Sequence, residues 1–180
     1  SNDDRLHVVS VSSLLPVKRV HLIAAALKHT QRKIKWTHIG GGETLSKVLV
    51  ETGEVGENVE VDLMGQVAHE DVLKWFEENS ADVFVNVSSS EGLPVSIMEA
   101  FSYGIPAIAT AVGGMPEIVT DECGVLLQSD FKPEELGAIL EEWDISNTAR
   151  RDASLDKQRT EYSSWKNALK FALEIANGVW

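Results

Sequence analysis

The sequence is poor in cysteine and in long apolar runs. Cys123 is the only cysteine among 180 residues, so the chain cannot form an internal disulfide. It begins the strand-like run CGVLLQ, where we expect a small buried residue rather than a reactive thiol. The longest apolar runs, such as LIAAAL, are far shorter than the roughly 20 residues that a membrane-spanning helix needs. The first residues, SNDDR, lack a signal-peptide pattern, and a cytoplasmic location is therefore the default expectation.

Basic residues are also scarce. Lysine and arginine number 16 against 28 aspartates and glutamates, which gives a formal net charge of -12. This balance argues against general nucleic-acid binding, because such proteins need a basic face to neutralise phosphates. One small anionic ligand is not excluded, since a local site can be positive on an acidic protein. The sequence contains no Asp-x-Asp motif and no His/Cys cluster at metal-binding spacing, so we expect neither a metal nor another cofactor.

The composition is that of one globular domain. Hydrophobic residues make up 43% and charged residues 24%, which is ordinary for a folded chain of this size. We therefore expect a single domain over residues 1–180. The chain starts without Met and reaches its first strand within a few residues, so we expect it to be a piece of a longer protein.

Strand-like and helix-like segments alternate along the chain. Apolar β-branched runs predict six strands, over residues 6–12, 34–40, 59–65, 81–88, 106–111 and 124–128. Apolar residues at helical spacing predict helices over residues 18–29, 43–53, 70–79 and 133–143, and one that starts near Val95. Strand–helix alternation predicts an α/β fold, with a six-stranded parallel sheet between two layers of helices. Ligands of such folds bind at the carboxyl ends of the strands, where the strand order reverses.

The last part of the chain, residues 145–180, is expected to hold C-terminal helices. Residues 144–164 form a charged stretch with few apolar residues, which predicts a connection rather than a helix. A helix is expected to follow, with Trp165, Leu169, Ala172 and Ala176 at helical spacing.

The segment SSSEGLPVSIMEAF, residues 88–101, carries the most chemical information. Gly92 allows a tight turn, and Pro94 suits the first turn of a helix that starts near Val95. The free N–H groups of that helix start form a potential phosphate site. Glu91 and Glu99 flank it, and a carboxylate can accept hydrogen bonds from two neighbouring sugar hydroxyls. The alternative, in which both glutamates are solvated surface residues, is equally compatible with these residues alone.

The stretch from Glu91 to Val119 resembles the signature of glycosyltransferase family 4, retaining enzymes of the GT-B fold. The matching positions are Glu91, Gly92, Glu99, Ala100, Gly104, Pro106, Gly113, Gly114, Pro116 and Glu117. The resemblance covers nearly the whole chain, because SVSSLLPVKRV, WTHIGGG, LMGQV and DVFVNVSSSEG precede the signature in the family's order. It implies a Rossmann-like domain, the C-terminal, donor-binding half of a GT-B enzyme.

The resemblance also implies roles for the residues of the signature. Glu99 would bind the ribose of a nucleoside diphosphate sugar, and Glu91 would contact the donor sugar as the catalytic glutamate. The donor's diphosphate would lie at the turn and the helix start, formed by Gly92, Leu93, Val95 and Ser96.

Further donor-binding residues are expected on the loops after the first three strands. The family usually has an arginine after the first strand and a lysine five residues later, both on the diphosphate. Lys18 matches the lysine, but Ser13 stands where the arginine is expected, and Arg19 is the nearby cation. Gly41, after the second strand, and Gln66, after the third, are the remaining donor-binding candidates. His38 is expected to be a strand-end histidine rather than a ligand or base.

The resemblance implies that the sugar passes to an acceptor held by an amino-terminal domain of the same chain, in polysaccharide or glycolipid synthesis. We therefore expect this chain to bind nucleotide and to transfer no sugar alone. An exposed Phe171 or Trp180 could mark the contact with that amino-terminal domain. The longer enzyme of which this chain is expected to be a part could lie at the inner face of a membrane. A non-catalytic sugar-nucleotide-binding or interaction domain that kept the fold is the alternative, and Ser13 supports it.

Overall fold

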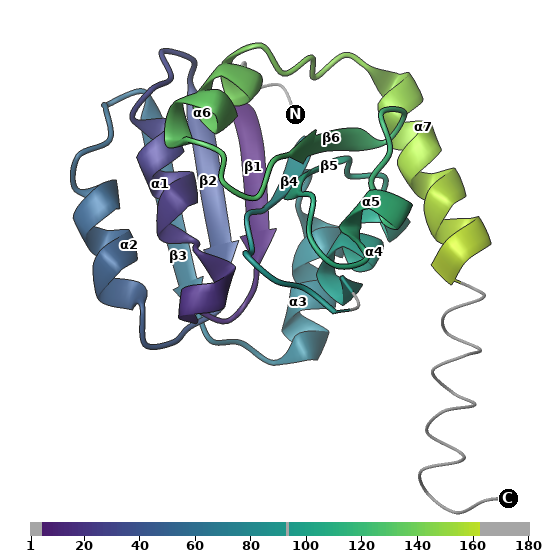
Figure 1. The fold of residues 1–180 in the computed structure, drawn as a ribbon, viewed down its shortest axis with the longest axis horizontal. Helices are drawn as coiled ribbons and strands as arrows, with labels where there is room; N and C mark the ends of the chain where they lie inside the picture. The colour runs from purple at the N-terminus through teal and green to yellow at the C-terminus, as the bar shows by residue number, and fades with distance from the viewer. Residues whose placement is uncertain (1–4, 93, 163–180) are drawn as a thin grey trace, which may run out of the picture.

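The computed structural model describes residues 5–92 and 94–162. Its sheet consists of six strands: β1 (Leu6–Val11), β2 (Ile34–Ile39), β3 (Val59–Gly65), β4 (Val83–Asn86), β5 (Ala107–Thr110) and β6 (Gly124–Leu127). All neighbouring strands are parallel, in the order β3-β2-β1-β4-β5-β6 (Figure 1). The predicted six-stranded, Rossmann-like α/β fold is therefore confirmed.

Helices cover both faces of this sheet. The helices are α1 (His21–Leu27), α2 (Leu45–Thr52), α3 (His69–Glu78), α4 (Val95–Ser102), α5 (Met115–Ile118), α6 (Pro133–Glu141) and α7 (Thr148–Lys157). One hydrophobic cluster joins α1, α2 and α6 to one face of the sheet, around the fully buried Trp36. A second joins α3, α4 and α5 to the other face, around Phe84 and Phe101. Two separate apolar layers thus hold the sheet as a central plane.

The first predicted helix is divided in two. A 3₁₀-helix, η1 (Pro16–Lys18), precedes α1, and Arg19 between them has φ of 50°. A left-handed residue cannot continue a right-handed helix, so the prediction of one helix over residues 18–29 is wrong at its start. Lys18 consequently ends a short turn instead of opening a helix.

The charged stretch predicted as a connection contains a helix. Helix α7 begins after Asn147, whose side chain accepts a hydrogen bond from the Arg150 N–H, and the π-helix η2 (Gln158–Tyr162) continues it. Few apolar residues are needed because α7 packs against the outside of α4, with Leu155 beside Gly104 (Figure 1). The predicted helix over residues 165–178, and the candidate contact residues Phe171 and Trp180, lie outside the described residues.

Two smaller predictions can be compared with the structure. Cys123 is buried, as expected, immediately before β6. Within the described part of the chain, no helix has the length and apolar character needed to span a membrane.

Candidate functional site

The carboxyl ends of the central strands carry the candidate site. The strand order reverses between β1 and β4, since β2 and β3 lie on one side of this pair and β5 and β6 on the other. The loops that follow β1 and β4 are joined there, because the Ser89 N–H donates to the Val17 carbonyl oxygen at 2.8 Å. This is the position at which open α/β sheets bind their ligands.

Glu91 is the centre of a hydrogen-bond network in this position. Its Oε1 atom accepts from Lys18 Nζ at 2.7 Å, from Ser88 Oγ at 2.6 Å and from Asn86 Nδ2 at 3.1 Å. The Glu91 side chain is only 9% exposed, and that of Lys18 is 23% exposed. The network therefore joins the β1 loop to the end of β4 through one buried oxygen.

The same contacts control the charge of Glu91. Burial acts to raise the pKa of this carboxyl, but hydrogen bonds from Lys18, Ser88 and Asn86 outweigh it and hold the pKa below its usual value. Glu91 is therefore an anion at neutral pH. Within the described residues its second oxygen, Oε2, has no hydrogen-bond partner, so it can accept a hydroxyl from a ligand.

Arg19 is engaged in a different way. Its guanidinium donates to three backbone carbonyl oxygens, those of Val87 at 2.8 Å, Ser88 at 3.2 Å and Ser129 at 2.7 Å. It also lies over the ring of Phe131, 5.6 Å from the centroid. Arg19 thus fastens the carboxyl end of β4 to the loop after β6, and these contacts use three of its five N–H donors.

Position 113 requires a glycine because the backbone of Glu91 passes close to it. The φ of Gly113 is 55°, and a Cβ atom there would lie 2.0 Å from the Glu91 carbonyl oxygen. Only glycine avoids both the strained backbone and the collision. The loop after β5 therefore supports the backbone of the Glu91 turn.

The glycines after β2 make a similar approach to the β1 loop. Gly40 has φ of 142°, and a Cβ atom there would lie 1.8 Å from the Ser12 carbonyl oxygen. The neighbouring Gly41 accepts a hydrogen bond from the Leu14 N–H at 2.9 Å, and its own Cβ position lies against Gln66. These glycines bring the β1, β2 and β3 loops together.

Helix α4 begins immediately beyond the Glu91 turn. Pro94 precedes it, and within the described residues no side chain caps its first turn. The N–H groups of Val95 and Ser96 have no acceptor within the helix, because they belong to its first turn. The predicted helix start is confirmed, and it presents backbone donors next to Glu91. The structure of Leu93 lies outside the described residues.

Glu99 lies one turn further along α4. Its side chain is 12% exposed, and its Oε1 atom is bonded to Nε2 of His69 at 2.6 Å. His69 is the first residue of α3 and is 67% exposed. The two signature glutamates therefore lie on either side of the α4 start, each with a nitrogen partner from another element.

A hollow of about 250 Å³ lies beside His69. Ser13, Gly40, Gln66 and Val67 are among the residues that line it. Ser13 and Gln66, both predicted as donor-binding residues, are exposed and are thus brought together at this hollow. Their predicted contact with a donor stays a prediction.

His38 is buried at the carboxyl end of β2. Its Nδ1 atom is bonded to Ser10 Oγ at 2.9 Å, and Nε2 has no hydrogen-bond partner within the described residues. Burial lowers the pKa of His38 to about 4, so the ring is neutral at pH 7. Ser10 Oγ also accepts from Trp36 Nε1 at 3.0 Å, which makes His38 part of the interior. It lies next to the end of β2, as the sequence indicated.

The sequence did not identify three of the residues in this site. Asn86 and Ser88 hold Glu91, and His69 holds Glu99. Asn86 could have been suspected, because it is a polar residue within an otherwise apolar strand. His69 had no such signal, since its partner is 30 residues away.

Among residues 5–92 and 94–162, no three His, Cys, Asp or Glu side chains form a group that could hold a metal ion. The expectation that no metal is required stays a prediction.

Comparison with solved structures shows the same fold in other proteins, one of which is named as a galactosyltransferase. The lipopolysaccharide outer core galactosyltransferase WaaB superposes with a TM-score of 0.72 at 19% identity, over 87% of this chain and 46% of that one. Anabaena Alr3699/HepE, solved in complex with UDP and glucose, gives a TM-score of 0.70 at 21% identity, over 87% of this chain and 43% of that one.

Sequence comparison leads to the same class of protein. The chain is 29% identical over 134 residues to one subunit of the human phosphatidylinositol N-acetylglucosaminyltransferase, a match that covers 72% of this chain and 27% of that protein. It is 28% identical over 146 residues to the amylovoran biosynthesis glycosyltransferase AmsK of Erwinia amylovora, covering 75% of this chain and 35% of that protein. The chain thus spans about a third or less of the length of these relatives. The family model of the glycosyl transferases group 1 matches residues 1–159, and the chain belongs to this family.

Proposed function

We propose that the chain is the donor-binding domain of a retaining, family 4 glycosyltransferase, and that it binds a nucleoside diphosphate sugar at the carboxyl edge of its sheet. The observation that carries this proposal is the arrangement around the α4 start. Two anionic side chains, Glu91 and Glu99, flank backbone donors, and Lys18 lies beside the first of them. A donor of this class offers a sugar, a diphosphate and a ribose in the same linear order.

The diphosphate lies between the two glutamates in this proposal. Lys18 has three ammonium donors, so it can keep its bond to Glu91 and still donate to a phosphate oxygen. The N–H groups of Val95 and Ser96, in the first turn of the eight-residue helix α4, add further donors at the positive end of the helix dipole. Arg19 is the weaker candidate for a phosphate contact, because three of its five N–H donors already bond to carbonyl oxygens. Ser13 can supply one hydroxyl from the rim of the neighbouring hollow.

The two glutamates accept hydroxyl groups. The Oε2 atom of Glu91, which has no partner within the described residues, accepts from the donor sugar. The lowered pKa of Glu91 keeps its carboxylate in the anionic, accepting form. The anionic carboxylate of Glu91 would also lie next to the reacting sugar. There it would stabilise the positive charge that develops as the diphosphate departs. Glu99 accepts from the ribose hydroxyls. The base then extends toward the hollow beside Gly41 and Gln66.

Sugar transfer requires a second domain in this proposal. An acceptor held by an amino-terminal domain approaches the sheet edge, and closure of the two domains excludes water and completes the site. The relatives support a role in glycan synthesis, since one is named for amylovoran biosynthesis and another belongs to a phosphatidylinositol N-acetylglucosaminyltransferase. We therefore expect the isolated chain to bind nucleotide without transferring sugar, and turnover of a nucleotide sugar by the purified chain would contradict this.

A thermal-shift panel of uridine, guanosine, adenosine and cytidine diphosphates tests the binding proposal. A nucleotide at about 100 times its Kd should add roughly 2.7 kcal/mol to the free energy of unfolding. UDP is the first choice, because UDP occurs in the HepE complex and in a TarM complex that share this fold. Glu99→Ala and Lys18→Gln should each weaken the preferred nucleotide about tenfold or more. Lys35→Gln, at the opposite edge of the sheet, is the matched control and should leave the affinity unchanged.

The alternative function is a sugar-nucleotide-binding domain without chemistry. Ser13 in place of the expected arginine favours it, and so does the engagement of Arg19 elsewhere. The two functions differ in the role of Glu91. If the domain serves catalysis, Glu91→Gln in the full-length protein abolishes sugar transfer while nucleotide binding remains. If transfer is absent before any substitution, the binding-only function holds.

A further inference from the structure

We infer that His69 is a positioning residue that fixes the Glu99 carboxylate for ribose recognition. The inference rests on the proposed function, and it adds a residue from α3 to a site otherwise built from the β1 and β4 loops and α4. His69 lies outside the signature of residues 91–119. Its role follows from geometry alone.

The hydrogen bond between His69 and Glu99 has a defined donor and acceptor. An ionised carboxylate can only accept, so His69 Nε2 must carry the proton that lies between the two atoms 2.6 Å apart. This bond uses one acceptor position on Oε1. The carboxylate keeps further lone pairs on both oxygens, which suffices for two neighbouring hydroxyl groups of one ribose. His69 therefore orients the carboxylate without consuming its capacity.

The exposures of the two side chains are unequal. Glu99 is 12% exposed and His69 is 67% exposed. A solvent-exposed histidine contributes little to core packing, so its removal should not disturb the core. Its effect should instead fall on the carboxylate, which would lose the partner that orients it. Free rotation of a glutamate lowers affinity for a rigid diol, because the rotamers must be ordered on binding.

The elements that carry the pair are held together. The rings of Phe76 on α3 and Tyr103 after α4 stack with centroids 5.3 Å apart, and Tyr103 Oη donates to the Leu73 carbonyl oxygen at 3.4 Å. The separation of α3 from α4 is therefore set by packing and not by the His69–Glu99 bond itself. Such a frame keeps His69 in reach of Glu99 whether or not a ligand is bound.

His69 also lines the hollow shared by Ser13 and Gln66. It thus lies between the hollow assigned to the base and the carboxylate assigned to the ribose. A nucleoside placed across these two features would have its glycosidic bond near the imidazole.

The experiment compares UDP with 2′,3′-dideoxy-UDP by titration calorimetry. His69→Ala should weaken UDP about five- to tenfold and leave the dideoxy analogue unchanged, because that analogue has no diol for Glu99. His69→Gln should recover most of the loss, since its amide can donate from a position near that of Nε2. In a Glu99→Gln background, His69→Ala should cause no further loss of UDP affinity.

The outcomes separate the inference from the proposed function. If another nucleotide of the panel binds and UDP does not, the same comparison is made with that nucleotide and its 2′,3′-dideoxy analogue. Failure of all four nucleoside diphosphates to bind the unmodified chain, or an unchanged nucleotide affinity in Glu99→Gln, overturns the ribose assignment and the inference with it. If Glu99→Gln weakens UDP but His69→Ala does not, only the inference is overturned. Equal weakening of UDP and the dideoxy analogue by His69→Ala also overturns it, because the histidine would then act on the base, the phosphates or the fold. Thermal unfolding midpoints of the free variants verify that each is folded.

Discussion

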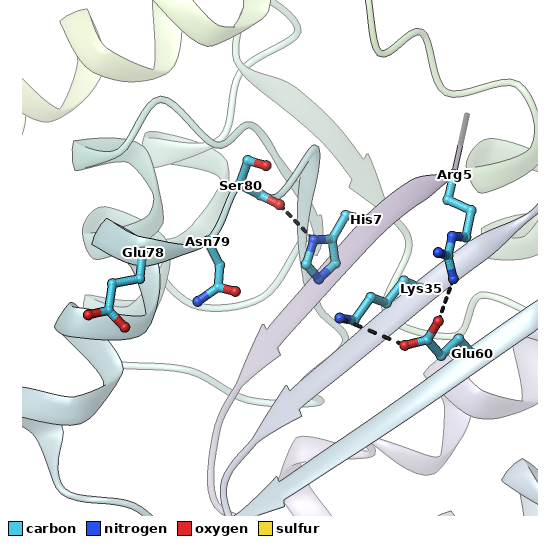
Figure 2. Close-up of a pocket in the computed structure, with 7 residues that line it drawn as sticks. All are labelled: Arg5, His7, Lys35, Glu60, Glu78, Asn79 and Ser80. Carbon is cyan, nitrogen blue, oxygen red and sulfur yellow. Dashed lines mark hydrogen bonds and ion pairs between the residues drawn. The ribbon is translucent and has the colours of Figure 1, made fainter. Parts of the chain in front are cut away.

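The two edges of the sheet both carry charged clusters, but they are built differently. At the carboxyl edge, three donors converge on one oxygen of Glu91, whose side chain is 9% exposed. At the amino edge, Glu60 bonds to Arg5, lies 3.8 Å from Lys35 and is 50% exposed (Figure 2). A buried acceptor with several donors restricts the backbone around it, whereas an exposed ion pair contributes little.

Each edge also has a histidine. His38, at the carboxyl edge, is fully buried and one of its ring nitrogens has no partner in the described structure. His7, at the amino edge, is hydrogen-bonded through Nδ1 to the Ser80 carbonyl oxygen (Figure 2). Its Nε2 atom is hydrogen-bonded to Thr37 Oγ1. His7 and the charged groups around Glu60 line a hollow of about 300 Å³ at the amino edge. Arg5, Lys35, Glu60 and His7 in this lining already have partners within the protein. Charge alone therefore does not mark a site, whereas burial of an acceptor and convergence of several donors on it do.

The largest effect should come from the glycine that supports Glu91. Gly113→Ala introduces a left-handed alanine and a Cβ atom 2.0 Å from the Glu91 carbonyl oxygen. We expect a loss of about 3 kcal/mol or more in the free energy of unfolding, measured by urea denaturation. Gly65→Ala is the matched control, because its φ is 71° but no described atom lies within 4 Å of the Cβ position. It should cost only about 1–2 kcal/mol. Equal losses would show that the Glu91 turn adapts freely.

The second effect is the pH dependence that His38 imposes. The pKa of His38 is lowered from 6.5 to about 4 by burial, so between these values the unfolded chain binds a proton that the folded chain does not. Stability must therefore fall as the pH falls through this window, by about 2 kcal/mol between pH 7 and pH 5.

Denaturation of the wild type and of His38→Gln at several pH values measures this slope. The variant should lose most of it, whatever its stability at pH 7. His7→Gln is the amino-edge control. Burial also lowers the pKa of His7, but both of its ring nitrogens are bonded, so we expect it to remove less of the slope. An unchanged slope in His38→Gln would contradict the assignment.

The third effect concerns Glu91 itself. Glu91→Gln removes the charge that Lys18 neutralises and puts an amide among three donors, at an expected cost of about 1–2 kcal/mol near pH 7. Because the pKa of Glu91 is lowered in the folded protein, its stabilisation is complete above the unfolded pKa of 4.5 and is lost as the pH falls through the folded value. The difference between wild type and variant should therefore shrink below pH 4.5. A constant difference down to pH 3 would assign the loss to shape and not to charge.

Much of the fold could be predicted from the sequence, because it depends on local patterns. The six strands are apolar and β-branched, and their alternation with helices dictates a parallel sheet. Helix α7 was missed because its stability comes from packing on α4 and from the cap at Asn147, with little apolar periodicity of its own. The predicted first helix starts later than expected, because Arg19 has a left-handed backbone angle that no hydrophobic pattern reports.

The site was predictable only in part. Glu91, Glu99 and the α4 start follow from one continuous segment. Their partners do not, because Lys18 is 73 residues from Glu91 and His69 is 30 residues from Glu99. The position of Arg19 also required the structure, since its contacts with Val87 and Ser129 depend on how three loops meet. Sequence indicates which side chains carry the chemistry, and the fold decides which of them meet.

The smallest effect should come from the amino edge, and it is the sharpest check on the comparison. Glu60→Gln removes the carboxylate that contacts both Arg5 and Lys35 (Figure 2). We expect the free energy of unfolding to change by less than about 0.5 kcal/mol, because Glu60 is 50% exposed and water screens both contacts. High salt should abolish even this difference. Urea denaturation at low and high ionic strength measures it beside Glu91→Gln. If the two glutamines cost the same, convergence on a buried oxygen adds nothing to an ion pair, and the distinction between the two edges fails.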